Sequence, residues 1–106
     1  MLKACRVDEV EPGDTLQLIC DDHPAIAIYN VDGTFYATDD LCSHGDASLA
    51  DGLLEGCAIE CPFHAGTFDV RTGEALTRPC VDKINAYPVK IEDDHVYVLL
   101  NETAPA

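Results

Sequence analysis

Four residues of types that bind metals occur in two short segments of this chain. The first segment is Cys42-Ser43-His44, and the second, sixteen residues later, is Cys61-Pro62-Phe63-His64. Each segment supplies one thiol and one imidazole separated by one or two residues, so both side chains of a pair can reach one centre from a tight loop. The candidate ligands of one closed metal site are therefore Cys42, His44, Cys61 and His64.

Two cofactors suit this donor set. Two Cys and two His bind a single zinc ion in many structural sites, and the same four residues also bind a cluster of two irons and two sulfides. Zinc fingers usually pair Cys with Cys and His with His, whereas each segment here has one residue of each type. A two-iron cluster with a thiolate end and an imidazole end matches two facing loops of this composition. The spacing favours the iron-sulfur cluster, and a zinc-stabilised interaction module remains the alternative.

The charge of the chain excludes several classes of partner. Its 106 residues include 20 acidic and six basic ones, and the net charge is −14. Nucleic acids and anionic membranes would be repelled, and a basic surface on another protein would be attracted. No apolar run approaches the roughly 18 residues of a membrane span, and the first residues lack the apolar segment of a signal peptide. We therefore expect a soluble, cytoplasmic protein.

Outside the two segments, no arrangement of residues suggests catalysis. No Ser/His/Asp set or pair of carboxylates stands out, and His23 and His95 lie beside turns, where solvated histidines are common. The remaining cysteines lack the spacing of a disulfide framework and are expected to be reduced; they are Cys5, Cys20, Cys57 and Cys80. The sequence does not predict an enzyme.

The rest of the chain is expected to form short strands. Residues 15–20 alternate between apolar and polar types, whereas residues 25–31 are apolar almost throughout, as in a central strand. Asp32-Gly33 favours a type I′ hairpin turn. The expected strands are 2–7, 15–20, 25–31, 35–39, 57–60, 67–70, 87–92 and 96–100. Residues 47–56 show little periodicity beyond one helical turn near 47–50. This pattern predicts an all-β sandwich or barrel of antiparallel sheets.

The spacing of the four candidate ligands resembles that of the Rieske family. By length, the chain is similar to the free-standing Rieske ferredoxins of bacterial aromatic-ring-hydroxylating dioxygenase systems. The resemblance implies one domain over residues 1–106, an antiparallel β-sandwich with a cluster-binding part of two loops at about 40–82. It implies that Cys42 and Cys61 bind one iron through sulfur, and that His44 and His64 bind the other through nitrogen. It also implies a proline-containing loop over the cluster, for which Pro79 is the candidate.

The function that the resemblance implies is one-electron transfer. A monomeric carrier would take electrons from an NAD(P)H-dependent flavoprotein reductase and deliver them to a terminal aromatic-ring dioxygenase, which would itself select the substrate. The ring edges of His44 and His64 would be the route for the electron, and Phe63 and Pro79 would form a small apolar docking surface. Phe63 could instead pack its loop against the base. A permanently bound Rieske subunit of a larger redox enzyme, such as a nitrite reductase, is a further alternative.

Departures from the high-potential members of the family predict a low reduction potential. Those proteins join two extra loop cysteines in a disulfide, but Ala47 and Phe63 stand at these positions here. They also place a serine and a tyrosine, which donate hydrogen bonds to the cluster, where this chain has Gly66 and Phe68. Lost donors and nearby carboxylates both oppose the added electron, so we expect about −150 mV. The carboxylates are Asp39, Asp40 and Asp46, the last of which could instead bind its own loop backbone.

Overall fold

The computed structural model describes residues 2–42, 47–62, 66–77 and 83–100. Within these residues it has strands in three antiparallel sheets and two single turns of 3-10 helix, which confirms the all-β prediction. The strands are β1 Leu2–Arg6, β2 Thr15–Leu18, β3 Ile26–Val31, β4 Thr34–Asp39, β5 Leu53–Glu55, β6 Ala58–Glu60, β7 Thr67–Asp69, β8 Ala86–Tyr87, β9 Val89–Glu92 and β10 His95–Val98. The 3-10 turns are η1 Val7–Glu9 and η2 Leu49–Asp51.

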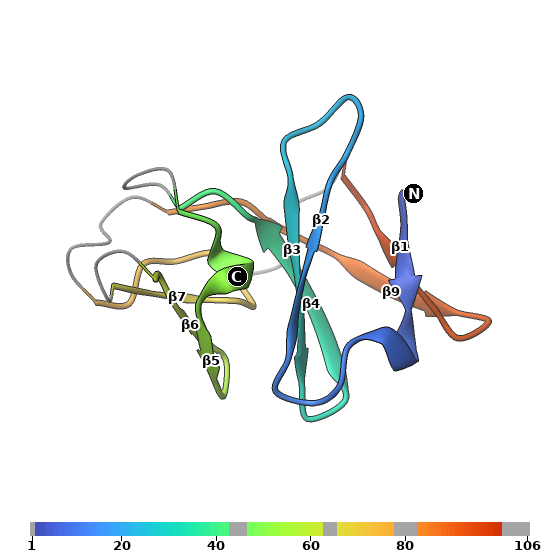
Figure 1. Ribbon diagram of the computed structural model, residues 1–106, viewed down its shortest axis with the longest axis horizontal. Helices are drawn as coiled ribbons and strands as arrows, with labels where there is room; N and C mark the ends of the chain where they lie inside the picture. Colours follow the sequence, from blue (N-terminus) through green and yellow to red (C-terminus); the bar gives the residue numbers. More distant parts are fainter. Residues whose placement is uncertain (1, 43–46, 63–65, 78–82, 101–106) are drawn as a thin grey trace.

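Two sheets, in the orders β1-β10-β9 and β2-β3-β4-β8, form the part that we call the base (Figure 1). Between them lies an apolar core, the base core, which includes Ile26, Ile28, Val96 and Val98. The base corresponds to the expected sandwich of antiparallel strands. As predicted for a central strand, β3 lies between two neighbours, whereas β1 lies at an edge.

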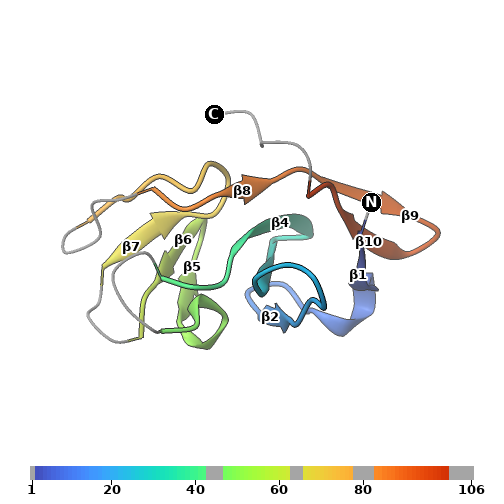
Figure 2. The same cartoon turned by 90° about the horizontal axis from the view of Figure 1, so that it is seen from above.

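The third sheet, β5-β6-β7, lies beside the base and packs against the other face of β3 (Figure 2). Its inward residues Ile59 and Phe68 join Ala27 and Tyr29 of β3 in a second core, the site core. Successive residues of a strand point to opposite faces, so β3 sends Ile26 and Ile28 to the base core and Ala27 and Tyr29 to the site core. This burial on both faces is the reason that β3 is apolar almost throughout.

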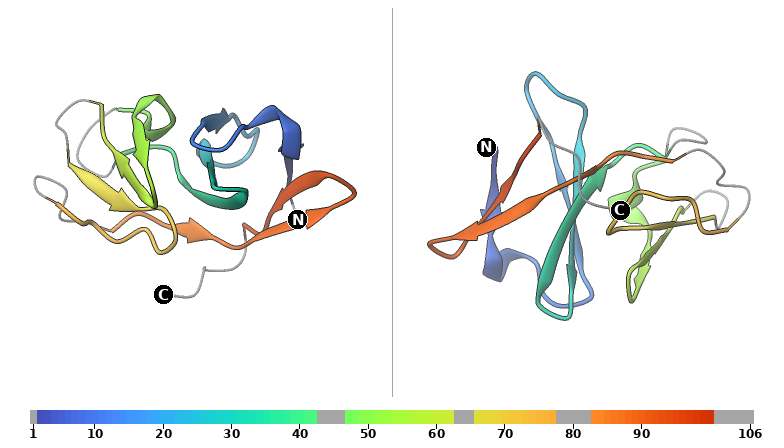
Figure 3. Two further views of the ribbon diagram at one scale, coloured as in Figure 1. Left: turned by 90° about the horizontal axis from the view of Figure 1, so that it is seen from below. Right: turned by 180° about the vertical axis from the view of Figure 1, so that it is seen from behind.

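The segment 83–92 connects the two parts, running along one side of the molecule from the β5–β7 part to the base (Figure 3). The alternation of residues 87–92 predicted one strand, but the structure divides it at Pro88. β8 pairs with β4, whereas β9 pairs with β10 in the other sheet. Because proline has no N–H to donate to a ladder, it suits this change of sheet.

Two hairpin turns of the base use the left-handed backbone region. Asp32 and Gly33 have φ angles of 52° and 93°, which confirms the predicted type I′ turn between β3 and β4. The amide oxygen of Asn30 accepts a hydrogen bond of 2.7 Å from the N–H of Gly33 and supports this turn. Asp93 and Asp94, with φ angles of 51° and 62°, make the corresponding turn between β9 and β10.

Candidate metal centre

The first ligand segment begins where β4 ends. Leu41 pairs with Ser48 in an isolated antiparallel bridge, so the chain leaves and returns at adjacent positions. The N–H of Cys42 donates a hydrogen bond of 3.0 Å to the carbonyl oxygen of Ala47. This bond and the bridge together form a backbone frame where the loop begins and ends. Cys42 is buried, with 1% of its surface exposed. The backbone thus holds the first candidate ligand at the root of a short loop.

The second segment has a frame of the same kind. Glu60 of β6 pairs with Thr67 of β7, one residue outside the loop on each side. The N–H of Cys61 donates a hydrogen bond of 2.8 Å to the carbonyl oxygen of Gly66. In both frames a cysteine N–H therefore binds the carbonyl oxygen five residues later. The two candidate cysteines are presented by equivalent backbone structures.

Both cysteines belong to the site core. Cys42 and Cys61 are each 1% exposed, and the apolar side chains in this core include Leu49, Ile59 and Phe68. An apolar surrounding excludes water and strengthens electrostatic interactions at a bound metal. The structure therefore places the two candidate sulfur donors in the same buried apolar core, although they are nineteen positions apart in the sequence.

The buried carboxylate of Asp40 supports the first loop through hydrogen bonds. Asp40 Oδ1 accepts hydrogen bonds from the hydroxyl of Ser48 at 2.9 Å and from the N–H of Ala50 at 3.0 Å. Its Oδ2 accepts one of 2.8 Å from Nε2 of Gln17, on β2 of the base. Thr15, also on β2, donates its hydroxyl to the carbonyl oxygen of Ala50 at 2.5 Å. The first loop is thereby attached to the base at both of its ends.

The role of β2 was not predicted from the sequence. Alternation placed Thr15 and Gln17 on the polar face of this strand, and that face meets the first loop and η2. The apolar side chains Leu16 and Leu18 pack against the base core, as expected. Alternation identifies a face but not what covers it, so no local signal could have shown these contacts.

The side chain of Asp39 contacts a different part of the protein from the side chain of Asp40. Its carboxylate accepts hydrogen bonds from the hydroxyl of Tyr87 at 2.5 Å and from the N–H of Asn85 at 3.0 Å. Burial, and secondarily the bond to Asp39, raises the pKa of Tyr87 above its ordinary value. Asp39 also lines a pocket of about 350 Å³ with Leu41, whose side chain is 56% exposed. These contacts attach segment 83–87 to the strand that leads into the first loop.

Several residues of the predicted site lie outside the described part of the chain. They include the candidate ligands His44 and His64, and also Phe63, Pro79 and Asp46. Gly66 and Phe68, which stand where hydroxyl donors occur in high-potential relatives, are both buried, and Phe68 belongs to the site core. Cys57 is partly buried against the same core.

The comparison with known families decides what the site is. The model of the Rieske [2Fe-2S] domain matches residues 1–88. The chain belongs to the Rieske [2Fe-2S] family. Its cofactor is a Rieske [2Fe-2S] cluster rather than the zinc ion of the alternative interpretation. The residues present fit this group, because thiolate sulfur is the donor that such clusters take from cysteine, and both buried cysteines meet in one core.

Individual relatives of this Rieske protein are ferredoxins. The chain is 45% identical over 103 residues to the 3-phenylpropionate/cinnamic acid dioxygenase ferredoxin subunit of Shigella flexneri serotype 5b, covering 96% of this chain and 95% of the relative. The structure of a Sphingomonas yanoikuyae B1 ferredoxin matches with a TM-score of 0.89 and 47% identity, covering 92% and 95% of the two chains. A chain in a complex of reduced oxygenase and oxidized ferredoxin in carbazole 1,9a-dioxygenase matches with a TM-score of 0.91 and 38% identity, covering 99% and 96%.

Proposed function

We propose that this Rieske protein is the ferredoxin of an aromatic-ring dioxygenase system. It takes single electrons from an NAD(P)H-dependent flavoprotein reductase and delivers them to a terminal dioxygenase. It acts as a monomer in the cytoplasm, and residues 1–106 form one domain with the cluster-binding part at about 40–82. The observation that carries this proposal is the 45% identity to a dioxygenase ferredoxin subunit over almost the whole of both chains. Among the described residues, no helix has the length and apolar character to cross a membrane.

The proposed ligands are Cys42 and Cys61 for one iron and His44 and His64 for the other. When bound, the cluster accepts and returns one electron at a time. The backbone frames hold the two cysteines, with the Cys42 N–H bound to Ala47 and the Cys61 N–H bound to Gly66. The site core keeps water from the sulfur atoms, and the neutral imidazoles add no negative charge. Two ferric ions, two sulfides and two thiolates sum to zero, so reduction leaves one negative charge.

The first test of the proposal is spectroscopic. Purified protein is expected to be red-brown, and after reduction with dithionite it should give the EPR spectrum of a histidine-ligated [2Fe-2S] cluster, with a low average g value. Cys42→Ser should lose this signal, whereas the matched variant Cys57→Ser, which changes a partly buried cysteine outside the proposed ligand set, should retain it. Retention by Cys42→Ser of the signal with unchanged g values would refute the ligand assignment, because replacing a sulfur ligand by oxygen changes the g values.

The second test concerns the partners. We would combine the protein with NADH and with the purified reductase and oxygenase of the relative's 3-phenylpropionate/cinnamic acid dioxygenase system. Substrate oxidation should require the protein and should stop with the Cys42→Ser variant. An intact cluster that the reductase cannot reduce, or whose electron does not reach the oxygenase, would argue against the proposed pathway. Size-exclusion chromatography tests the monomeric state.

A further inference from the structure

We propose that the buried carboxylate of Asp40 is a fixed negative charge that lowers the reduction potential of the cluster and positions the first ligand loop. This inference rests on the proposed ligand set. Asp40 is a positioning residue, since it acts through its charge and its loop contacts and is not itself a ligand. The sequence placed Asp39, Asp40 and Asp46 near the site without distinguishing them. The structure separates the first two by their surroundings.

The Asp40 carboxylate is buried, so water screens its charge only weakly. It stands two residues before Cys42, and only 3% of its surface is exposed. Water screens the charge of an exposed carboxylate, but a charge inside a protein interacts several times more strongly with its neighbours. An electron added at the cluster adds negative charge to the same region. The Asp40 carboxylate therefore opposes reduction.

The groups that bind Asp40 satisfy its oxygens but do not cancel its charge. The groups of the described chain that donate to the Asp40 carboxylate are neutral: the Ser48 hydroxyl, the backbone N–H of Ala50 and the Gln17 amide. The described ion pairs involve other carboxylates, namely Arg6–Asp8, Arg71–Asp69 and Lys90–Glu92. Among the described residues, the buried Asp40 carboxylate thus has hydrogen-bond donors but no cationic side chain paired with it.

The same contacts make Asp40 a brace for the loop. Its carboxylate joins the residue before the loop to Ser48 and Ala50 after it, and its carbonyl oxygen accepts the N–H of Leu49 at 2.7 Å. Gln17 connects this assembly to β2 of the base. Asp39, in contrast, faces the pocket beside Leu41 and is partly exposed. Of these two described carboxylates, Asp40 is the one that is both buried and bound to residues after the first loop.

The substitution Asp40→Asn tests the charge with little change of shape. The Asn oxygen can accept from Ser48 and Ala50, and the Gln17 amide can turn so that its oxygen accepts from the new NH₂ group. The reduction potential, measured by redox titration with the EPR signal as readout, should rise. We expect about a tenfold change in the one-electron equilibrium constant, which is about 59 mV. The rise should persist at high salt, because the charge is buried.

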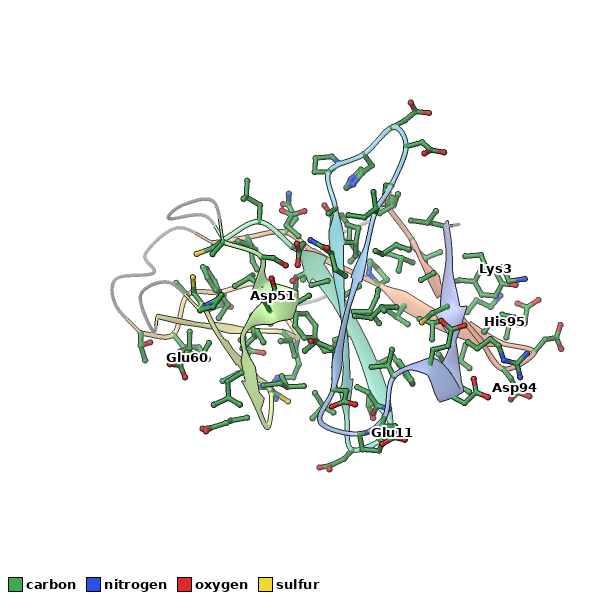
Figure 4. All side chains as sticks on the ribbon, in the orientation of Figure 1. Lys3, Glu11, Asp51, Glu60, Asp94 and His95 are labelled. Atoms are coloured by element: carbon green, nitrogen blue, oxygen red, sulfur yellow. The ribbon has the colours of Figure 1, made fainter. Side chains whose placement is uncertain are left out.

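Matched variants separate the charge from the brace. Asp51→Asn removes one charge from exposed η2, and Glu60→Gln removes one from half-buried β6 (Figure 4); their effects should be smaller than that of Asp40→Asn and should decline with salt. Ser48→Ala removes a donor but keeps the charge, so it should not raise the potential. If Asp40 only braces the loop, Asp40→Asn, which keeps the hydrogen bonds from Ser48 and Ala50, should leave the potential unchanged, and that result would overturn the proposal.

Gln17→Lys provides an independent test if Asp40→Asn fails to assemble a cluster. It places a cation beside the unchanged carboxylate and should also raise the potential, whereas Gln17→Leu should not. An unchanged potential in Gln17→Lys, or in a loaded Asp40→Asn protein, would overturn the proposal. The proposed function fails by a different result, which is the absence of the Rieske EPR signal or of electron delivery in the unsubstituted protein.

Discussion

At the scale of single residues, the types of the ligands determine the charge of the site. Each thiolate adds one negative charge and each neutral imidazole adds none, so replacing two thiolates by imidazoles raises the potential of a [2Fe-2S] cluster. In this chain the proposed thiolates are the described and buried Cys42 and Cys61. The absence of hydroxyl donors at Gly66 and Phe68 works in the opposite direction. The expected value of about −150 mV therefore stays a prediction for redox titration.

His64→Cys should keep a cluster but lower its potential. The new thiolate adds one negative charge to the site, and half of the gap between about −150 mV and about −400 mV suggests a fall of about 125 mV. Redox titration followed by EPR measures the change. His95→Cys, which places a thiol in the base, is the control and should leave the potential unchanged. An unchanged or higher potential in His64→Cys would contradict the charge argument.

A second residue-scale prediction concerns Asp69 and Arg71. The Asp69 carboxylate accepts hydrogen bonds from Nε and Nη2 of Arg71 at 3.0 and 2.9 Å and from the Arg71 N–H at 2.9 Å. The side-chain hydrogen bond to Arg71 is the main cause that lowers the pKa of Asp69. A lowered pKa in the folded state means that the stabilisation is present above about pH 4 and is lost as the pH falls through the folded pKa.

The free energies of unfolding of the wild type and of Asp69→Asn should therefore become more alike in acid. Urea denaturation should show the variant to be less stable at pH 7, with a smaller difference between the two proteins at pH 3. Because both proteins carry the same proposed ligands, acid loss of the cluster affects them alike. A stability difference that does not depend on pH would show that the carboxylate charge is not involved.

At the scale of elements, two hairpin frames and η2 hold the loops. Gly52, the residue after η2, lies so close to β6 that a Cβ atom there would overlap the carbonyl oxygen of Glu60. Glu60 directly precedes Cys61, so a displacement of this strand moves a proposed ligand. The glycine is thus required by a close approach of two backbones.

Gly52→Ala should destabilise the protein by about 2 kcal/mol or more and reduce the amount of cluster retained. Gly56→Asn is the matched control, because Gly56 has a φ of 58° that Asn tolerates and has open space around the position of a Cβ atom. Urea denaturation and iron content per chain measure the two effects. Equal values for the two variants would contradict the proposed close approach.

Local turn signals and strand pairing explain which strands were predicted from the sequence and which were missed. The hairpin of β3 and β4 was predicted because Asp32-Gly33 is a strong local signal. β5 was not predicted, since Leu53–Glu55 has three residues and is defined by its pairing with β6. The division at Pro88 was also missed, because the alternation continues through a change of sheet. Ile91, an apolar residue of β9, is 49% exposed.

At the scale of the whole molecule, negative charge predominates. Acidic side chains occur on both parts of the structure: Figure 4 shows Glu11 and Asp94 on the base, Asp51 on η2 and Glu60 on β6. With a net charge of −14, the protein presents a negative field to a partner.

The rate of electron transfer from the reduced protein should change with salt concentration. The direction of the change should depend on the charge of the acceptor. The initial rate of reduction of cytochrome c, a cationic acceptor, should fall when ionic strength rises from about 0.01 to about 0.15 M, because the Debye length shortens from about 30 to about 8 Å. The rate with ferricyanide, an anion, should rise over the same range. Stopped-flow absorbance measures both. The same salt dependence for both acceptors would argue against electrostatic steering.

The sequence by itself predicted the candidate donor set, and it determined the family and the positions of most strands. Two Cys-to-His spacings identify the candidate ligands, and alternation and turn residues are properties of neighbouring positions. The tertiary structure decided what surrounds each residue. Asp39 and Asp40 are adjacent and identical in type, yet one binds Tyr87 beside a pocket and the other is buried among Gln17, Ser48 and Ala50. Such surroundings depend on contacts between distant segments, which local patterns do not contain.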